Sequence, residues 1–237
     1  MSLTPPKLEN IQEYWFNNNP ALTHFMHSLS VLFDKGESYF MKSITAFMIE
    51  NPEFKQDIIK FCKEERSHSL LHNQMNASFK NKKLLQKLEK RTGKIINIGT
   101  KFLSKKQNLA VTAALEHVTC SLATQLLSRP DLQDIMISDV KKAWLYHALE
   151  ESSESHRTIA YKLYQKVSNN HLQRYLLMIL GSFILSLVIS EYWFEIMYDD
   201  TFDGFFEAVY ILFIKNGGFL PNIIPQYLEW FSLNHQP

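Results

Sequence analysis

The sequence contains few residues that interrupt helices. Its 237 residues include only seven glycines and eight prolines, and segments with a helical period outnumber strand-like alternations. The sequence therefore predicts an all-α fold. We expect helices at residues 21–32, 36–50, 52–77, 80–92, 105–128, 131–167, 169–199, 202–215 and 221–233.

Cysteine is also scarce, and nothing at the start of the chain resembles a secretory signal. Cys62 and Cys120 both lie in apolar helical sequence, which favours buried thiols in a reducing compartment over a disulfide. The opening MSLTPPKLEN has no apolar core segment of the kind that signal peptides need. We therefore expect a cytoplasmic protein.

The chain has no strong excess of charge of either sign. Its net charge is +1, and lysine and arginine are spread along the sequence apart from a cluster at residues 80–94. Nucleic acid is therefore not an expected partner. There is also no Gly-x-Ser-x-Gly elbow, no catalytic Cys-His pattern and no glycine-rich phosphate loop. Any chemistry should run through metal.

The stretch KEERSHSLLH carries the first metal-ligand pattern. Glu65 and His68 are three residues apart, and His72 follows four residues later, so all three project from one side of a helix. A dinuclear carboxylate site takes one Glu from each of two helices and a Glu-x-x-His from each of two others. The alternative is a solvated charged face, because isolated Glu-x-x-His pairs also arise by chance.

Two single glutamates in apolar surroundings supply the next candidates. Glu37 lies between Phe33 and Phe40, where a carboxylate is costly unless it is paired or bound to metal. Its alternative role is to complement the dipole of a helix that begins after Gly36. Glu116 is the one acid in the helix NLAVTAALEHVTCSLATQLL, and an isolated buried carboxylate is normally neutralised or partnered.

The fourth helix, AWLYHALEESSESHRTIAYKLY, offers more ligands than the site needs. One stripe of it carries His147, Glu150, Glu151 and Glu154. His156 lies on the opposite side of a straight helix, which would leave His147 as the ligand. A π-bulge at residues 152–153 would instead bring Glu151 and His156 together and leave His147 in support. We favour the bulge.

These motifs resemble a known family. LSVLFDKGESYF, FCKEERSHSLLHNQMN, AALEHVT and YHALEESSESHRTIAYKLY are similar to the predicted metal-dependent hydrolases. The resemblance implies a ferritin-like bundle, with these ligands or near-ligands: Glu37, Glu65, His68, His72 and Glu116. The fourth motif departs from the family, because Tyr146 replaces a Trp and extra residues follow the Glu pair. The remaining ligands are therefore to be chosen from His147, Glu151, Glu154 and His156.

Carboxylate and imidazole ligands indicate two transition-metal ions, with iron first and manganese or zinc as alternatives. A di-iron site with open positions is typical of oxygen-activating oxidases and oxygenases. A pair of metals can also activate water for hydrolysis. Two other classes stay open, namely a non-catalytic metal-binding protein and a membrane-associated helical protein.

We expect residues 1–170 to form the bundle and 171–237 to pack on it as apolar helices. Residues 175–190 are uncharged, and the apolar run continues to residue 198 if two glutamates are accepted. A transmembrane helix needs about 20 apolar residues. We favour a buried helix over membrane association through residues 175–198 or a homodimer interface. An apolar route to the metals would suit a hydrophobic small-molecule substrate.

Overall fold

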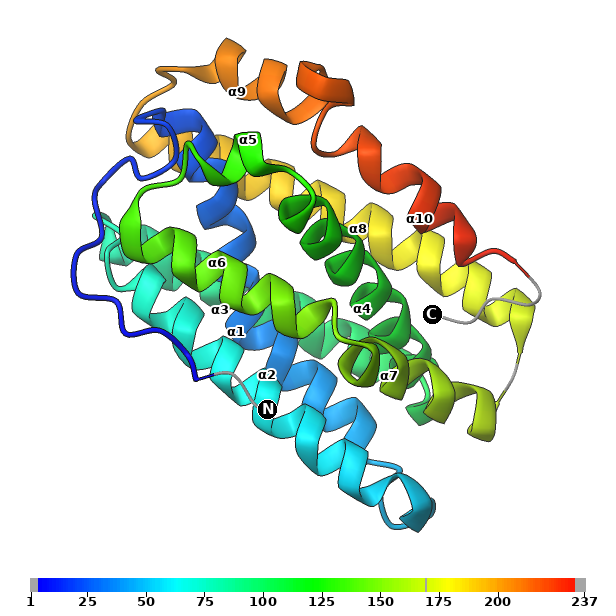
Figure 1. Cartoon of the computed structure of the whole chain (residues 1–237). Helices are drawn as coiled ribbons and strands as arrows, with labels where there is room; N and C mark the ends of the chain where they lie inside the picture. The colour runs from blue at the N-terminus through cyan, green and yellow to red at the C-terminus, as the bar shows by residue number, and fades with distance from the viewer. Residues whose placement is uncertain (1–3, 169, 233–237) are drawn as a thin grey trace.

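The protein is all-α in the computed structural model, which describes residues 4–168 and 170–232 (Figure 1). Within these residues no β-strand forms, and a single isolated bridge joins Phe16 to Met136. The helices are α1 (Pro20–Thr45), α2 (Lys55–Asn76), α3 (Lys82–Phe102), α4 (Lys105–Leu127), α5 (Pro130–Gln133), α6 (Ser138–Glu151), α7 (Glu154–Val167), α8 (His171–Asp199), α9 (Phe205–Phe213) and α10 (Ile224–Glu229). Short 3-10 turns lie at Pro52–Phe54, Lys215–Gly217 and Pro221–Ile223.

The centre of the molecule is a bundle with four helical positions. α1 packs on α2, while α6 and α7 together occupy one position and pack on both α4 and α2. α3 packs on α1, and α8 packs along α1 and α4. α9 and α10 run along the upper edge of the molecule in Figure 1. The division of the chain at residue 170 stays a prediction.

α1 differs from the sequence prediction because it is one continuous helix. Asn19 caps its start by accepting a hydrogen bond from the Leu22 backbone N–H at 2.8 Å. The helix then runs through Gly36 without a break, so the predicted helices at 21–32 and 36–50 are one element. Glu37 therefore lies far from a helix start, and the expectation that it complements a first-turn dipole is wrong.

Other predicted boundaries also shift. α3 continues past Gly93 and Gly99 to Phe102, because an interior glycine weakens a helix without ending it. The predicted helix at 131–167 is divided into α5, α6 and α7. α8, α9 and α10 lie within the predicted 169–199, 202–215 and 221–233, of which residues 169 and 233 fall outside the described parts.

Two large hydrophobic clusters bracket the middle of the bundle. One is built around the start of α1, α6 and α9 and includes Leu22 and Trp144. The other joins the end of α1 to α2, α4 and α7 and includes Phe61 and Tyr161. Buried apolar surface of this kind contributes about 25 cal/mol per Å² to folding. The polar groups between the clusters are therefore held in a scaffold that apolar packing stabilises.

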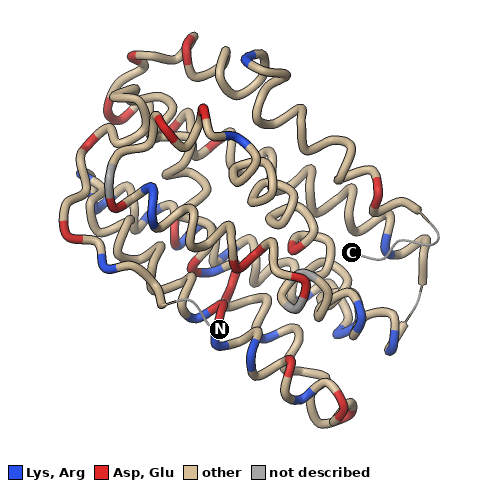
Figure 2. Tube along the Cα trace, in the orientation of Figure 1, with Lys and Arg blue, Asp and Glu red and all other residues tan. Residues whose placement is uncertain are grey.

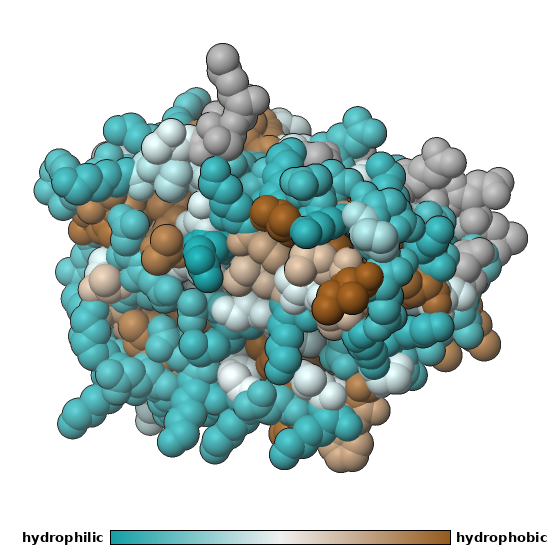
Figure 3. All heavy atoms as spheres, turned by 90° about the horizontal axis from the view of Figure 1, so that it is seen from below, coloured by the Kyte–Doolittle hydropathy of each residue, from teal (hydrophilic) through white to brown (hydrophobic). Residues whose placement is uncertain are grey.

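α8 presents two different faces. Tyr192 and Met178 are fully buried, whereas Phe183 and Leu187 are more than half exposed. The sequence prediction that residues 175–198 form a buried helix is therefore wrong for the outward face of α8. Charged residues are absent from the middle of this helix (Figure 2), and only 22% of its apolar window is buried. By contrast, the face viewed from below is mostly hydrophilic, although some hydrophobic side chains gather near its centre (Figure 3).

Among the described residues, α8 is the one helix long and apolar enough to cross a membrane, by length and composition alone. The core helix of a soluble protein can pass the same test. Membrane association through 175–198 and a homodimer both stay predictions.

The break between α6 and α7 consists of two serines. α6 ends at Glu151, Ser152 and Ser153 are not helical, and α7 begins at Glu154. The Ser153 hydroxyl accepts a hydrogen bond from the His156 backbone N–H at 3.4 Å and so caps the new helix. The predicted π-bulge is therefore wrong in form, because the helix stops and restarts here.

We predict that Ser153→Ala lowers the free energy of unfolding by about 1 kcal/mol, the usual cost of losing an N-cap. Urea denaturation of the metal-free protein measures this. Ser152→Ala is the matched control, because its hydroxyl bonds only the Leu149 carbonyl on the exposed side, and it should change stability by less than about 0.5 kcal/mol. Equal effects of the two substitutions would contradict the capping role.

Candidate metal centre

Four helical positions direct acids and histidines into one buried volume. α1 supplies Glu37, and α4 supplies Glu116. α2 supplies Glu65, His68 and His72, while His147, Glu150 and Glu151 come from α6 and His156 from α7. All of these side chains are buried, and four of them have no exposed surface at all: Glu65, His68, His72 and His156.

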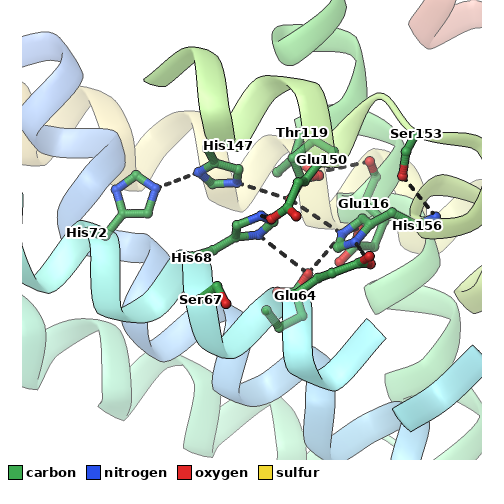
Figure 4. A network of polar contacts seen from close by, with 12 residues as sticks. Glu64, Ser67, His68, His72, Glu116, Thr119, His147, Glu150, Ser153 and His156 are labelled. Carbon is green, nitrogen blue, oxygen red and sulfur yellow. Dashed lines mark hydrogen bonds and ion pairs between the residues drawn. The ribbon is translucent and has the colours of Figure 1, made fainter. Parts of the chain in front are cut away.

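Among the described residues these side chains form two groups in which the donor atoms lie within 4.8 Å of one another. The first group consists of Glu65, His68, Glu151 and His156. The second group consists of Glu37, His72 and His147. Figure 4 shows His68, His147 and His156 turned toward a common centre from different helices.

The two groups are joined by contacts along α6. His147 Nε2 lies 3.0 Å from Glu151 Oε1, and His147 Nδ1 lies 2.6 Å from His72 Nε2. Glu116 lies beside the first group, with Oε2 at 3.4 Å from His156 Nε2. The two groups and Glu116 therefore form one continuous cluster.

The electrostatics of the cluster are unfavourable without a cation. Burial, and then the neighbouring carboxylates, raise the pKa of Glu37 and Glu65 well above the usual range. The same causes raise the pKa of Glu116 to about 7. Burial disfavours charge on His156 too, but the adjacent Glu151, Glu116 and Glu64 outweigh it and raise that pKa. The carboxylates can therefore all ionise only if positive charge is supplied.

Unpartnered donor atoms test whether these residues fit metal ions. Both carboxylate oxygens of Glu37, Glu65 and Glu116 are buried without a hydrogen-bond partner, as are His68 Nδ1 and His156 Nε2. His156 Nε2 does lie 2.9 Å from Glu65 Oε1, but this contact lacks hydrogen-bond geometry. Buried polar atoms are nearly always satisfied. A set of orphaned oxygens and imidazole nitrogens that converge is what metal ligands require.

Carboxylates orient two of the histidines from outside the groups. Glu64 Oε2 lies 3.1 Å from His156 Nδ1, and Glu150 Oε2 lies 3.1 Å from His68 Nε2. A carboxylate on one ring nitrogen keeps the proton there and leaves the other nitrogen free to coordinate. The free atoms are the two orphaned imidazole nitrogens named above.

The Ser30 hydroxyl fixes which ring nitrogen of His72 carries the proton. Ser30 donates its hydroxyl proton to Asn76 Oδ1 at 2.8 Å, while the Asn76 amide donates to the Ser30 carbonyl. The Ser30 oxygen can then only accept from His72 Nδ1, which lies 3.0 Å away. His72 Nε2 is therefore left without a proton and faces His147 inside the second group.

The break between α6 and α7 explains why both disputed histidines reach the centre. A straight helix would place His147 and His156 on opposite sides, but the extended backbone at Ser153 interrupts the helical period before α7 begins. It also ends the stripe that was expected to include Glu154. Glu154 is exposed in the first turn of α7 and belongs to neither group, so its prediction as a ligand is wrong.

Sequence reasoning missed three supporting residues. Ser30 precedes Glu37 by seven residues and so shares its face, which is a signal that could have been found. Glu64 stands next to Glu65, on a different side of the helix, and only the fold brings it to His156. Thr119, whose hydroxyl donates to Glu151 Oε2 at 2.9 Å, gave no signal because threonine is common in buried helices.

A comparison with protein-family models matched residues 5–237 to the model described as "Predicted metal-dependent hydrolase". The chain belongs to this family. The predicted resemblance is thereby confirmed over nearly the whole chain. Searches of curated proteins and of solved structures found no match. The ferritin-like topology implied by the resemblance stays a prediction, as do the individual roles of the residues as ligands.

For this member of the predicted metal-dependent hydrolases, we predict that Glu64→Gln weakens metal binding by about 10- to 100-fold, the usual cost of losing a carboxylate that orients a ligand histidine. Competition with a coloured chelator measures the affinity. Glu154→Gln is the matched control on the exposed side of the same break, and it should bind metal normally. If the two variants bind alike, Glu64 does not orient His156.

Proposed function

We propose that the protein is an enzyme with a dinuclear metal centre, in which iron is the resident metal. The observation that carries this proposal is the set of buried, unpartnered carboxylate oxygens and imidazole nitrogens that converge in two adjoining groups. Leaving such atoms unsatisfied costs about 1–3 kcal/mol for each neutral group and more for charged ones.

Charge balance supports two ions over one. Four carboxylates in the groups or beside them are at most 4% exposed, namely those of Glu37, Glu65, Glu116 and Glu151, whereas Glu64 and Glu150 are more exposed and contact the outer nitrogens of the histidines. Two divalent cations would neutralise four ionised carboxylates, whereas one would leave an excess of negative charge in the interior. Uncompensated buried charge is strongly destabilising.

The ligand chemistry supports iron. Among the described residues neither group includes a cysteine. Carboxylate and imidazole together suit iron and manganese, whereas structural zinc sites often use thiolates. Manganese and zinc are the alternatives that metal analysis would identify.

For the reaction, we propose oxidation of a hydrophobic small molecule with dioxygen. Iron ions in such a site would supply the redox chemistry. The chain's own residues would exclude water and fix the ligands. Phe33 stacks on His72 with ring centroids 4.4 Å apart, and Phe61 lies 4.8 Å from the His156 ring. Thr119 holds Glu151 through its hydroxyl. These apolar surroundings favour an apolar substrate.

Hydrolysis is the second candidate, because the family is described as predicted metal-dependent hydrolases. A two-metal site can lower the pKa of a bound water and stabilise a leaving oxygen. The same side chains would serve as ligands in either reaction. The two candidates therefore differ in metal preference and in the need for oxygen.

We predict that protein produced in iron-replete medium contains about two equivalents of transition metal, mainly iron, because there are two coordination points. His156→Ala and His72→Ala should each retain about one equivalent, since each removes a ligand from one group only. Glu65→Ala and Glu116→Ala should also each retain about one equivalent, because Glu65 belongs to the first group and Glu116 adjoins that group alone. Elemental analysis by mass spectrometry measures the content.

The control for these variants is His117→Ala. His117 is equally buried on α4 but lies 2.8 Å from the Gln226 carbonyl, outside both groups, so this variant should load metal fully. Wild-type protein with less than about half an equivalent of any transition metal would refute the dinuclear centre.

We predict that the protein loaded with ferrous iron consumes dioxygen faster than free iron in the same buffer, and that Glu116→Ala does not. An oxygen electrode measures the uptake. The protein loaded with zinc should be inactive in oxygen uptake because zinc has no redox chemistry. Ester hydrolysis by the zinc-loaded protein without oxygen, together with no uptake by the iron-loaded protein, would favour the hydrolase instead.

A further inference from the structure

An apolar cavity lies next to the metal centre, between α1, α3, α4 and α8. Its volume is about 220 Å³. None of the residues that line it in the described parts of the chain is charged. Its four lining hydroxyls, those of Tyr39, Thr92, Thr100 and Thr119, all have partners within the protein. The protons of all four hydroxyls are therefore already used, and none is free to donate to a ligand.

Glycines keep this cavity open. Gly36, Gly99 and Gly181 line it from three different helices, although each lies inside a helix. An interior glycine costs about 0.5–1 kcal/mol relative to alanine. A Cβ added at Gly36 or Gly99 would meet nothing within 4 Å. The missing side chains therefore correspond to empty space along the cavity.

The inner wall of the cavity touches the metal centre directly. Thr119 lines the cavity and donates its hydroxyl to Glu151. Phe33 lines it too, and its ring lies 4.4 Å from that of His72 and 4.8 Å from that of His147. A ligand in the cavity would therefore be separated from both groups by a single layer of side chains.

The cavity is long and narrow. Its lining spans residues 29–40, 92–103, 111–122 and 177–188, which at 1.5 Å per residue is a length of about 16 Å along each helix. A volume of about 220 Å³ is small for a space lined over that length. This shape suits a single extended chain better than a compact ring system.

The position of the metal centre along the cavity is also informative. Phe33 lies four residues from the start of 29–40 and seven from its end, and Thr119 lies three residues from the end of 111–122 and eight from its start. Each therefore stands about one helical turn from one end of the lining and two turns from the other. Leu180 and Ile184 line the cavity and are themselves 50% and 40% exposed. The cavity thus opens to the outside along α8, while the metal centre adjoins a point within its length, about one helical turn from one end.

We propose that this cavity binds one extended, unbranched aliphatic chain and holds an internal part of that chain beside the metal centre. The inference rests on the proposed function for its statement that this ligand is the substrate. Binding itself depends only on the cavity. A polar end group of the chain would lie outside, because the cavity has no partner for it.

The test is calorimetric titration of straight-chain primary alcohols into the full-length protein. The dissociation constant should fall by up to about fourfold for each added methylene, the expected gain for a buried CH₂. The improvement should stop near about twelve carbons, which fill about 16 Å when extended. Adamantan-1-ol, a compact alcohol, should bind much more weakly. Length-independent binding, or tighter binding of the compact alcohol, would overturn the proposal.

Glycine variants locate the binding site. Gly99→Leu and Gly181→Leu should raise the dissociation constant of the twelve-carbon alcohol by about tenfold or more, because the new side chain occupies the space of several methylenes. Gly93→Leu is the matched control on α3, since a Cβ there also meets nothing within 4 Å but does not line the cavity. Equal effects of Gly93→Leu and Gly99→Leu would contradict the assignment. Circular dichroism checks that each variant is folded.

The internal position is tested by nuclear magnetic resonance with manganese as a paramagnetic probe. In manganese-loaded protein, a ¹³C label in the middle of the bound alcohol should broaden more than a label on the terminal methyl. Strongest broadening at either end would overturn the internal position. Chain binding to a protein that holds no metal would refute the proposed function alone. Normal metal loading without chain binding would refute only the cavity proposal.

Discussion

The structure depends on the burial of four carboxylates within one helical bundle. Glu37, Glu65 and Glu116 have no hydrogen-bond partner for either oxygen, and Glu151 is shared between neighbouring histidines. Packing alone would not tolerate this, because buried unpaired charge costs several kcal/mol. The cluster is consistent with a stable fold only if cations or protons compensate it. The surrounding helices, which the two hydrophobic clusters hold together, bring these donors to one place.

The interruption between α6 and α7 is the clearest consequence of that need. A continuous helix would bury more backbone hydrogen bonds, but it would turn either His147 or His156 away from the centre. Ending α6 at Glu151 and restarting after Ser153 allows both to face inward. The cap on the new helix offsets part of the cost of the break. Helix stability is therefore reduced at the break between α6 and α7, where both His147 and His156 must face the centre.

Much of the site could be predicted from local spacing, and the errors have physical causes. Glu65, His68 and His72 share a helix face through the 3.6-residue period alone, and Glu116 is unusual in its apolar helix. The ligands on the predicted fourth helix were uncertain because a helical wheel assumes a straight helix. For that reason Glu154 was wrongly included among the candidate ligands. Gly36 was taken as a boundary, although packing on α2 carries α1 through it. The contact between Glu64 and His156 joins two different helices, so it depends on the fold and gives no signal in the sequence.

The cavity beside the metal centre also depends on the fold and gave no sequence signal. Gly36, Gly99 and Gly181 are far apart in sequence, and only the packing of α1, α3 and α8 places them around one space. On one side, Thr119 and Phe33 contact the candidate ligands Glu151 and His72, and on the other they face that space. Hydrophobic walls exclude water from the centre, which strengthens every electrostatic interaction within it. An apolar ligand can fill such a space without breaking a polar contact, whereas a polar one would lose its hydration without finding a partner. The fold therefore combines a polar interior, whose carboxylates cations or protons must compensate, with an adjoining apolar space suited to hydrocarbon, and residues 33 and 119 form the boundary between them.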